Sequence, residues 1–180
     1  MTHDLYATPS LYRRVFPVNE EEVQFFAHLL GQPRWVLDAA GGTGEPGDCV
    51  ARRLGAEYVC LDLSTKMAAL ARHRPIVGDL VALPFHDGVF DAAFSRLFGY
   101  AYAAGDYPEK VNHLAWELSR VLQPGALAVI EVPLAYRPKN LQGLEERAEI
   151  AGGGTYRFRY LDLLTDTPFG AILNSRIDVV

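Results

Sequence analysis

The stretch Val36-Leu37-Asp38-Ala39-Ala40-Gly41-Gly42-Thr43-Gly44 decides the fold of this chain. Its apolar start is short and the glycines end it abruptly, so it predicts a buried strand followed by a tight loop. Glu45-Pro46 then predicts the start of a helix, because proline is well tolerated in the first helical turn. Glycines also let a ligand approach the main chain closely. We therefore expect a strand, loop and helix that together form a nucleotide-type binding site.

Strand and helix patterns alternate along the chain on both sides of this stretch. Alternation of this kind predicts an α/β fold, a Rossmann-like doubly wound sheet that is mostly parallel. The strand at 126–132 is apolar throughout, as expected of a central parallel strand. The other strands are expected at 57–62, 75–78 and 89–95, and the helices at 20–30, 47–54, 65–72 and 108–122. The last of these helices has Val111, Leu114, Ala115, Leu118 and Leu122 on its apolar side.

The C-terminal part has weaker patterns. Residues 141–150 predict a helix, and 155–161 and 171–180 alternate in the manner of strands. We expect these strands to form an antiparallel pair at the edge of the sheet.

The length of 180 residues suits a single domain. We divide it into an N-terminal lid segment and helix over 1–33, a cofactor-binding core over 34–132, and a C-terminal helix with edge strands over 133–180.

Composition excludes several classes of protein. The net charge of -5 and the pI near 5.5 disfavour a nucleic-acid partner. The two cysteines, Cys49 and Cys60, lack metal-ligand spacing and fit a reducing compartment. The N-terminus lacks the basic and apolar regions of a signal peptide, and no apolar run reaches the length of a membrane span. These features predict a cytoplasmic protein without a metal.

Polar residues stand at the ends of four predicted strands. They are Asp38, Asp62, Asp79 followed by Leu80, and Ser95 followed by Arg96. Because ligands of open α/β sheets bind outside the carboxyl ends of the strands, we expect these residues to converge on one cleft. An acid at the end of the second strand is suited to binding ribose hydroxyls, which assigns that role to Asp62.

A dinucleotide site is the competing interpretation. Gly42-Thr43-Gly44-Glu45-Pro46-Gly47 satisfies the G-x-G-x-x-G pattern, and Asp62 stands about 20 residues further on, which together predict an NAD-dependent oxidoreductase. Asp38 and Glu45 disfavour it, because they place negative charge where a pyrophosphate would bind. A cofactor that carries a cation fits this charge better.

At this point the sequence resembles the class I methyltransferases that use S-adenosyl-L-methionine, especially the ubiquinone/menaquinone C-methyltransferase-like (methyltransferase type 11) branch. The match runs in order over residues 34–132. The matching stretches are Val36 to Gly44, Leu61-Asp62-Leu63-Ser64-Thr65-Lys66-Met67, Gly78 to Phe85, Phe90 to Ser95, and Val121 to Leu127. The chain departs from the common pattern at Ala40, where many members have glycine, and at Pro46-Gly47.

The resemblance implies a role for each matched position. The loop from Ala40 through Gly42 to Gly44 would pass the methionine end of the cofactor, with Asp38 beside it. Asp62 would hold the ribose, and Asp79 would accept a hydrogen bond from the adenine amine. The apolar residues expected at the adenine are Leu63, Met67 and Leu80, although Met67 equally suits a core position. Ser95 would face the gap in which the methyl group is transferred.

The acceptor side is less well defined. Tyr6, Arg96, Tyr100 and Tyr136 are the candidate substrate residues, and the N-terminal segment resembles the lids of related enzymes. No residue is identified as a catalytic base: His113 lies within a predicted helix, and His86 lies in a loop at the opposite end of the strands.

The sequence thus predicts S-adenosylmethionine-dependent methyl transfer to a small-molecule acceptor. Two alternatives stay open, an NAD-dependent oxidoreductase and a non-catalytic S-adenosylmethionine-binding protein. The short C-terminal part motivates the second alternative, and it also makes a homodimer one arrangement that would complete the acceptor pocket.

Overall fold

The computed structural model describes residues 7–96, 107–130, 145–149, 155–167 and 170–179, with side chains described for 7–96 and 113–130. The chain forms two compact units, one made of Met1–Pro17 and Pro133–Val180 and the other of Val18–Val132. That the whole chain acts as one domain stays a prediction.

The second unit contains a five-stranded sheet in the order β3-β2-β1-β4-β5, in which every neighbouring pair is parallel. The strand order reverses between β1 and β4, because the chain first builds outward from β1 through β2 and β3 and then returns to its other side. This confirms the doubly wound sheet. The strands are β1 (Trp35–Ala39), β2 (Glu57–Asp62), β3 (Pro75–Val77), β4 (Phe90–Ser95) and β5 (Leu122–Ile130).

The helices of this unit begin close to where the sequence predicts. They are α2 (Glu20–Leu30), α3 (Glu45–Leu54), α4 (Thr65–Ala68) and α5 (Tyr107–Val121). The Asn19 side chain accepts a hydrogen bond from the amide of Glu21 and caps α2, and Ser64 caps α4 in the same way. Helix α4 ends earlier than predicted. Leu70, just beyond it, is exposed, so little apolar contact is available to stabilise a longer helix.

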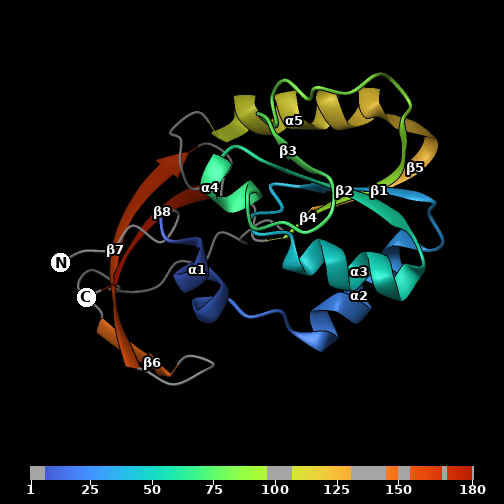
Figure 1. The fold of residues 1–180 in the computed structure, drawn as a ribbon. Coiled ribbons are helices and arrows are strands. Elements are labelled where there is room, and N and C mark those ends of the chain that lie inside the picture. Colours follow the sequence, from blue (N-terminus) through green and yellow to red (C-terminus); the bar gives the residue numbers. More distant parts are fainter. Residues whose placement is uncertain (1–6, 97–106, 131–144, 150–154, 168–169, 180) are drawn as a thin grey trace. The chain divides into compact units, whose positions relative to one another are not determined.

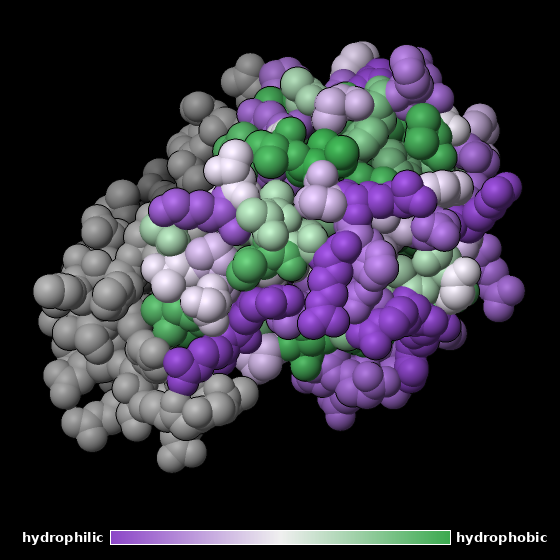
Figure 2. All heavy atoms as spheres, viewed as in Figure 1, coloured by the Kyte–Doolittle hydropathy of each residue, from purple (hydrophilic) through white to green (hydrophobic). Residues whose placement is uncertain are grey.

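Helices cover both faces of the sheet, with α5 on one face and α2 and α3 on the other (Figure 1). Alternate strand residues therefore enter two separate cores. Leu37 packs with Leu114 and Leu118 of α5, whereas Val36 packs with Phe26 and the other apolar residues of α2 and α3. Hydrophilic residues predominate over the outer side of α2 and α3, as expected of amphipathic helices (Figure 2).

Two details of the predicted core are wrong. Strand β5 lies at the edge of the five-stranded sheet rather than in its interior, and its Leu127 is exposed. On α5, Ala115 is exposed and the charged residue Glu117 is buried in its place. Hydrogen bonds that satisfy the Glu117 carboxylate make this burial possible.

The other unit contains α1 (Pro9–Val15) and a three-stranded antiparallel sheet in the order β6-β7-β8. Its strands are β6 (Glu145–Glu149), β7 (Thr155–Thr167) and β8 (Gly170–Val179). The expected antiparallel C-terminal strands are thus present, but they form a sheet of their own instead of an edge of the parallel sheet. The helix predicted over 141–150 is also wrong over Glu145–Glu149, because pairing with β7 overrides the helix propensity of this segment. Within the described ranges, every helix is too short or too polar to reach across a lipid bilayer.

We expect two substitutions on α5 to separate core packing from helix propensity. Leu118 is 3% exposed and packs against the sheet, so Leu118→Ala should lower the free energy of unfolding by about 2–5 kcal/mol. Trp116 is 63% exposed, so Trp116→Ala should change it by less than about 0.5 kcal/mol. Urea denaturation of the whole chain measures both values, and equal effects of the two substitutions would contradict this packing.

Candidate functional site

The loop after β1 is tied to the end of β2. The amide of Gly41 donates to the carbonyl of Leu61 at 3.0 Å, and the hydroxyl of Tyr58 donates to the carbonyl of Gly44 at 3.1 Å. Gly42 and Gly44 adopt positive φ angles of 58° and 73°, which glycine accepts without strain. Ala40, the position at which the resembled family commonly has glycine, also adopts the left-handed conformation, with φ 59°. The loop therefore keeps its turn despite this departure from the common pattern.

The first turn of α3 lies directly against this loop and the sheet. A Cβ atom on Gly47 would meet the Asp38 carboxylate and would come within 2.7 Å of Cε2 of Tyr58. A Cβ atom on Gly44 would come within 2.7 Å of the Cβ of Ala71. The unusual Pro46-Gly47 pair thus fits its surroundings: proline occupies the first helical turn, and glycine permits close packing on β1 and β2.

Asp38 is buried beneath this turn, with a relative exposure of 1%. Neither of its carboxylate oxygens has a well-formed hydrogen bond to a described residue, although the Gly47 amide lies near enough to act on the carboxylate. Burial, and to a smaller degree the nearby charge of Asp62, raise the pKa of Asp38, which is about 7 once all its surroundings have acted. The Arg96 charge and the Gly47 amide oppose this shift of the pKa but are smaller effects. The site therefore holds a buried acid without a counter-charge strong enough to keep its pKa low.

Asp62 connects the end of β2 to the glycine loop. Its Oδ2 accepts a hydrogen bond from the amide of Gly42 at 2.8 Å, and its Oδ1 accepts one from the amide of Ser64 at 2.8 Å. Burial raises its pKa, and these two amides oppose the rise. Each carboxylate oxygen has a second lone pair, so Asp62 can accept two further hydrogen bonds from a ligand.

The segment after β3 carries the next pair of predicted residues. The Oδ1 atom of Asp79 accepts a hydrogen bond from the amide of Val81 at 3.1 Å, which fixes the carboxylate in a local turn. The side chain of Leu80 is buried in the core that faces α5. Its contact with an adenine ring stays a prediction.

Two apolar candidates after β2 differ in their surroundings. Leu63 is 63% exposed directly after Asp62, which suits a residue that packs on a flat ligand. Met67 is buried, in agreement with the core position that the sequence left open.

The end of β4 contributes Ser95 and Arg96. Ser95 is buried, and its hydroxyl has no hydrogen-bond partner among the described residues. It follows Phe94, which pairs with Asp38 of β1 in the sheet. The Nε atom of Arg96 donates to the Glu22 carboxylate of α2, and the Arg96 charge acts on Asp38. Asp38, Asp62, Gly42 and Arg96 are thus brought together at one end of the sheet.

Several candidate residues cannot be placed in this way. Tyr6, Tyr100 and Tyr136 lie outside the described residues. His86 and His113 are exposed, in keeping with their rejection as bases. Among the residues described, no cluster of histidine, cysteine and acidic side chains could hold a metal ion.

Sequence reasoning missed two polar contacts. It did not identify Glu22 as the partner of Arg96, nor the interaction of Glu117 with Arg120. Glu117 could have been found, because it stands between Leu114 and Leu118 on the apolar stripe of its helix, where a charged residue needs a partner. Glu22 carried no such signal, since an acid in the first turn of a helix is ordinary.

The raised pKa of Asp38 predicts a specific pH dependence of stability. Between pH of about 4 and about 7 the folded chain retains a proton that the unfolded chain has released, so this contribution to stability is full below about pH 4 and is lost as the pH rises to about 7. We expect the stability of the wild type relative to Asp38→Asn to fall over this range, by at most about 4 kcal/mol, and then to level off. Urea denaturation of both proteins at a series of pH values measures the difference. A difference that does not vary with pH would show that Asp38 titrates normally.

Comparison with known proteins agrees with this geometry. A family model described as "Methyltransferase domain", of type 11, matches residues 37–130, which include β1, β2, β3, β4 and β5. A demethylmenaquinone methyltransferase of Thermus thermophilus is 38% identical over 126 residues, which cover 64% of this chain and 54% of the relative. The chain spans at most about half the length of this relative and about a third of that of the sterol methyltransferase-like 2 protein of Botryococcus braunii.

A solved structure shares the fold over nearly the whole chain. DesVI of Streptomyces venezuelae superimposes with a TM-score of 0.70 at 18% identity, covering 99% of this chain and 84% of DesVI. Over half of the chain thus matches the family model, and the fold matches as well. The chain belongs to the methyltransferase domain family, type 11, within the class I methyltransferases whose cofactor is S-adenosyl-L-methionine.

Proposed function

We propose that this chain binds S-adenosyl-L-methionine at the carboxyl ends of β1, β2 and β3 and transfers its methyl group to a small-molecule acceptor. The observation that supports this most strongly is Asp38, a buried carboxylate beside a glycine loop, whose two oxygens have no well-formed hydrogen bond to any described residue. A buried anion of this kind disfavours a phosphate and favours a cation. S-adenosylmethionine carries a sulfonium and an ammonium group and has no phosphate.

The neighbouring residues fit the rest of the cofactor. Asp62 retains two lone pairs for the ribose hydroxyls, and it already holds the loop at Gly42. Asp79 has one carboxylate oxygen fixed by Val81, and the other oxygen is available to accept a hydrogen bond from the adenine amine. Leu63 offers an exposed apolar surface beside the adenine.

The bound cofactor supplies an electrophilic methyl group whose transfer disperses positive charge. The chain's part is to position the reactants and exclude water, which together can account for much of the rate. Ser95 and Arg96 stand at the end of β4, next to the strand that carries Asp38, and Glu22 orients Arg96 there. We assign Ser95 to the cofactor side of the methyl-transfer gap and Arg96 to the acceptor side, together with Tyr6, Tyr100 and Tyr136, and assign no catalytic base.

A partly apolar acceptor fits the similar proteins best. The Thermus relative is named for demethylmenaquinone, and the Botryococcus relative for sterols. We further propose that the protein acts in the cytoplasm without a nucleic-acid partner. Its two cysteines are free and its net charge is negative. A homodimer is retained as the arrangement that would complete the acceptor pocket.

The two alternatives make different demands on the site. A dinucleotide would place its pyrophosphate at the N-terminus of α3, next to Asp38 and Glu45, where like charges repel it. A protein that only binds the cofactor would show the same affinity for it but no transfer to any acceptor. The first alternative is therefore tested by ligand binding and the second by turnover with candidate quinone and sterol acceptors.

We expect S-adenosylhomocysteine to raise the melting temperature of the whole chain and NAD to leave it unchanged. Asp62→Ala should weaken S-adenosylhomocysteine binding by about 10- to 100-fold, because hydrogen bonds to the carboxylate are lost. Calorimetric titration measures this change. Asp91→Ala is the matched control, because Asp91 also accepts two backbone amide hydrogen bonds, from Arg34 and Trp35 at the opposite end of the sheet.

The control variant Asp91→Ala should lose stability but keep its affinity for S-adenosylhomocysteine. Stabilisation by NAD but not by S-adenosylhomocysteine would reverse the assignment of the cofactor. Equal loss of affinity in both variants would show that Asp62 acts only through the stability of the fold.

A further inference from the structure

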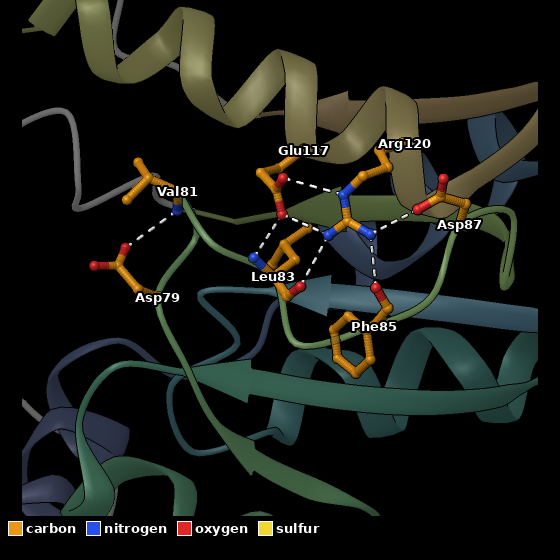
Figure 3. A network of polar contacts seen from close by, with 7 residues as sticks. All are labelled: Asp79, Val81, Leu83, Phe85, Asp87, Glu117 and Arg120. Carbon is orange, nitrogen blue, oxygen red and sulfur yellow. Dashed lines mark hydrogen bonds and ion pairs between the residues drawn. The ribbon is translucent and has the colours of Figure 1, made fainter.

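Two charged residues of α5 bind the backbone of the segment that connects β3 to β4 (Figure 3). The Glu117 carboxylate accepts a hydrogen bond from the amide of Leu83 at 2.6 Å. Arg120 donates from Nη2 to the carbonyl of Leu83 at 2.9 Å and from Nη1 to the carbonyl of Phe85 at 2.7 Å. The two side chains also bind each other, with 2.7 Å between Nη2 of Arg120 and Oε2 of Glu117. We call these two residues the α5 clamp.

The α5 clamp is the main polar attachment of this segment. Within the described part of the chain, every hydrogen bond from the backbone of residues 79–87 to a residue outside that range involves Glu117 or Arg120. The segment contains no strand or helix of its own that would fix its path. The apolar side chains of Leu80 and Leu83 anchor the segment in the core, and its backbone polar groups rely on two side chains of α5.

The clamp acts close to Asp79. Both backbone polar groups of Leu83 are taken, the amide by Glu117 and the carbonyl by Arg120. The preceding residue, Ala82, donates its amide to the carbonyl of Asp79 at 3.1 Å and closes a tight turn. Fixing Leu83 thus fixes one side of the turn from which the Asp79 carboxylate projects (Figure 3).

The pair satisfies the amide of Leu83 and the carbonyls of Leu83 and Phe85, so it contributes to stability. The ion pair also fixes the orientation of the backbone groups that it binds, because a guanidinium presents its donors in a rigid planar fork. The Arg120 side chain lowers the pKa of Glu117, so the pair stays ionised at neutral pH.

We propose that Glu117 and Arg120 are positioning residues for recognition of the adenine base: they hold the Asp79–Ala82 turn so that the Asp79 carboxylate meets the exocyclic amine. This inference rests on the proposed function, which assigns Asp79 to adenine. It adds that selectivity for adenine depends on two residues that do not touch the cofactor.

The test compares S-adenosylhomocysteine with S-inosylhomocysteine, in which an oxo group replaces the exocyclic amine. Calorimetric titration of the wild type should show tighter binding of the adenine compound, by about 10- to 100-fold, since the inosine analogue leaves the carboxylate without its donor. In Arg120→Lys and Glu117→Gln this ratio should fall to within about threefold of unity. A general loss of stability would weaken both ligands alike and leave the ratio unchanged.

Coupling to Asp79 gives a second, independent readout. Asp79→Asn alone should abolish the selectivity, and adding Glu117→Gln to it should not change the ratio further, because residues that act as a unit are not additive. Glu57→Gln is the matched control. It removes the partner of an exposed arginine, Arg74, with the two side chains 55% and 60% exposed, and it should keep the wild-type ratio.

The outcomes separate the two proposals. If the wild type binds neither compound, the proposed function fails and this inference falls with it. If the wild type binds both equally, Asp79 does not read the amine and the inference is overturned. If the wild type is selective and both clamp variants keep the full ratio, the proposed function stands and the clamp has no positioning role. Arg120→Lys retains the charge and serves as the milder variant if Glu117→Gln does not fold.

Discussion

The burial of the Asp38 carboxylate under the first turn of α3 is the constraint on which the site depends. Two glycines make it possible: Cβ atoms at Gly41 and Gly47 would both collide with this carboxylate. The result is a buried acid with no well-formed hydrogen bond to the described residues, whose pKa is raised to about 7, mainly by desolvation and also by the neighbouring Asp62. Without a ligand, burial disfavours the ionised form of the Asp38 carboxylate. A bound cation would stabilise that ionised form. Under the proposed function, the group that is least favourable in the free protein is the one that selects the ligand.

The parallel sheet determines how the other groups meet Asp38. Because neighbouring strands run in the same direction, β2 and β4 end beside β1 and bring Asp62 and Ser95 to the same edge. Helices cover both faces of the sheet (Figure 1), and ligands of such sheets bind outside the carboxyl ends of the strands. The segment after β3 lacks such support from the sheet, and α5 provides it through Glu117 and Arg120. Under the two proposals, the strands position most of the cofactor-binding groups and α5 positions the segment that carries Asp79.

The sequence predicts the parallel sheet well and the C-terminal part poorly, for physical reasons. Up to Ile130 the glycines, prolines and helix caps mark the boundaries, and apolar spacing identifies the strands and helices between them. The segment Glu145–Glu149 consists of good helix formers, so only its pairing with β7 makes it a strand, and its own residue types do not indicate that pairing. Within the site, Asp38 and Asp62 follow from their positions at strand ends. The Glu117 and Arg120 contacts do not, because they depend on which face of α5 meets a distant loop.

Proton release on ligand binding tests the central claim most directly. If a cationic ligand group lowers the pKa of Asp38 from about 7, S-adenosylhomocysteine should displace about half a proton from the wild type at pH of about 7. Calorimetric titration in buffers of different ionisation enthalpy measures this number. In Asp38→Asn the release should disappear while weaker binding persists. Binding of S-adenosylhomocysteine without proton release from the wild type, or with the same release from Asp38→Asn, would contradict the role of Asp38 as the cation-selecting group.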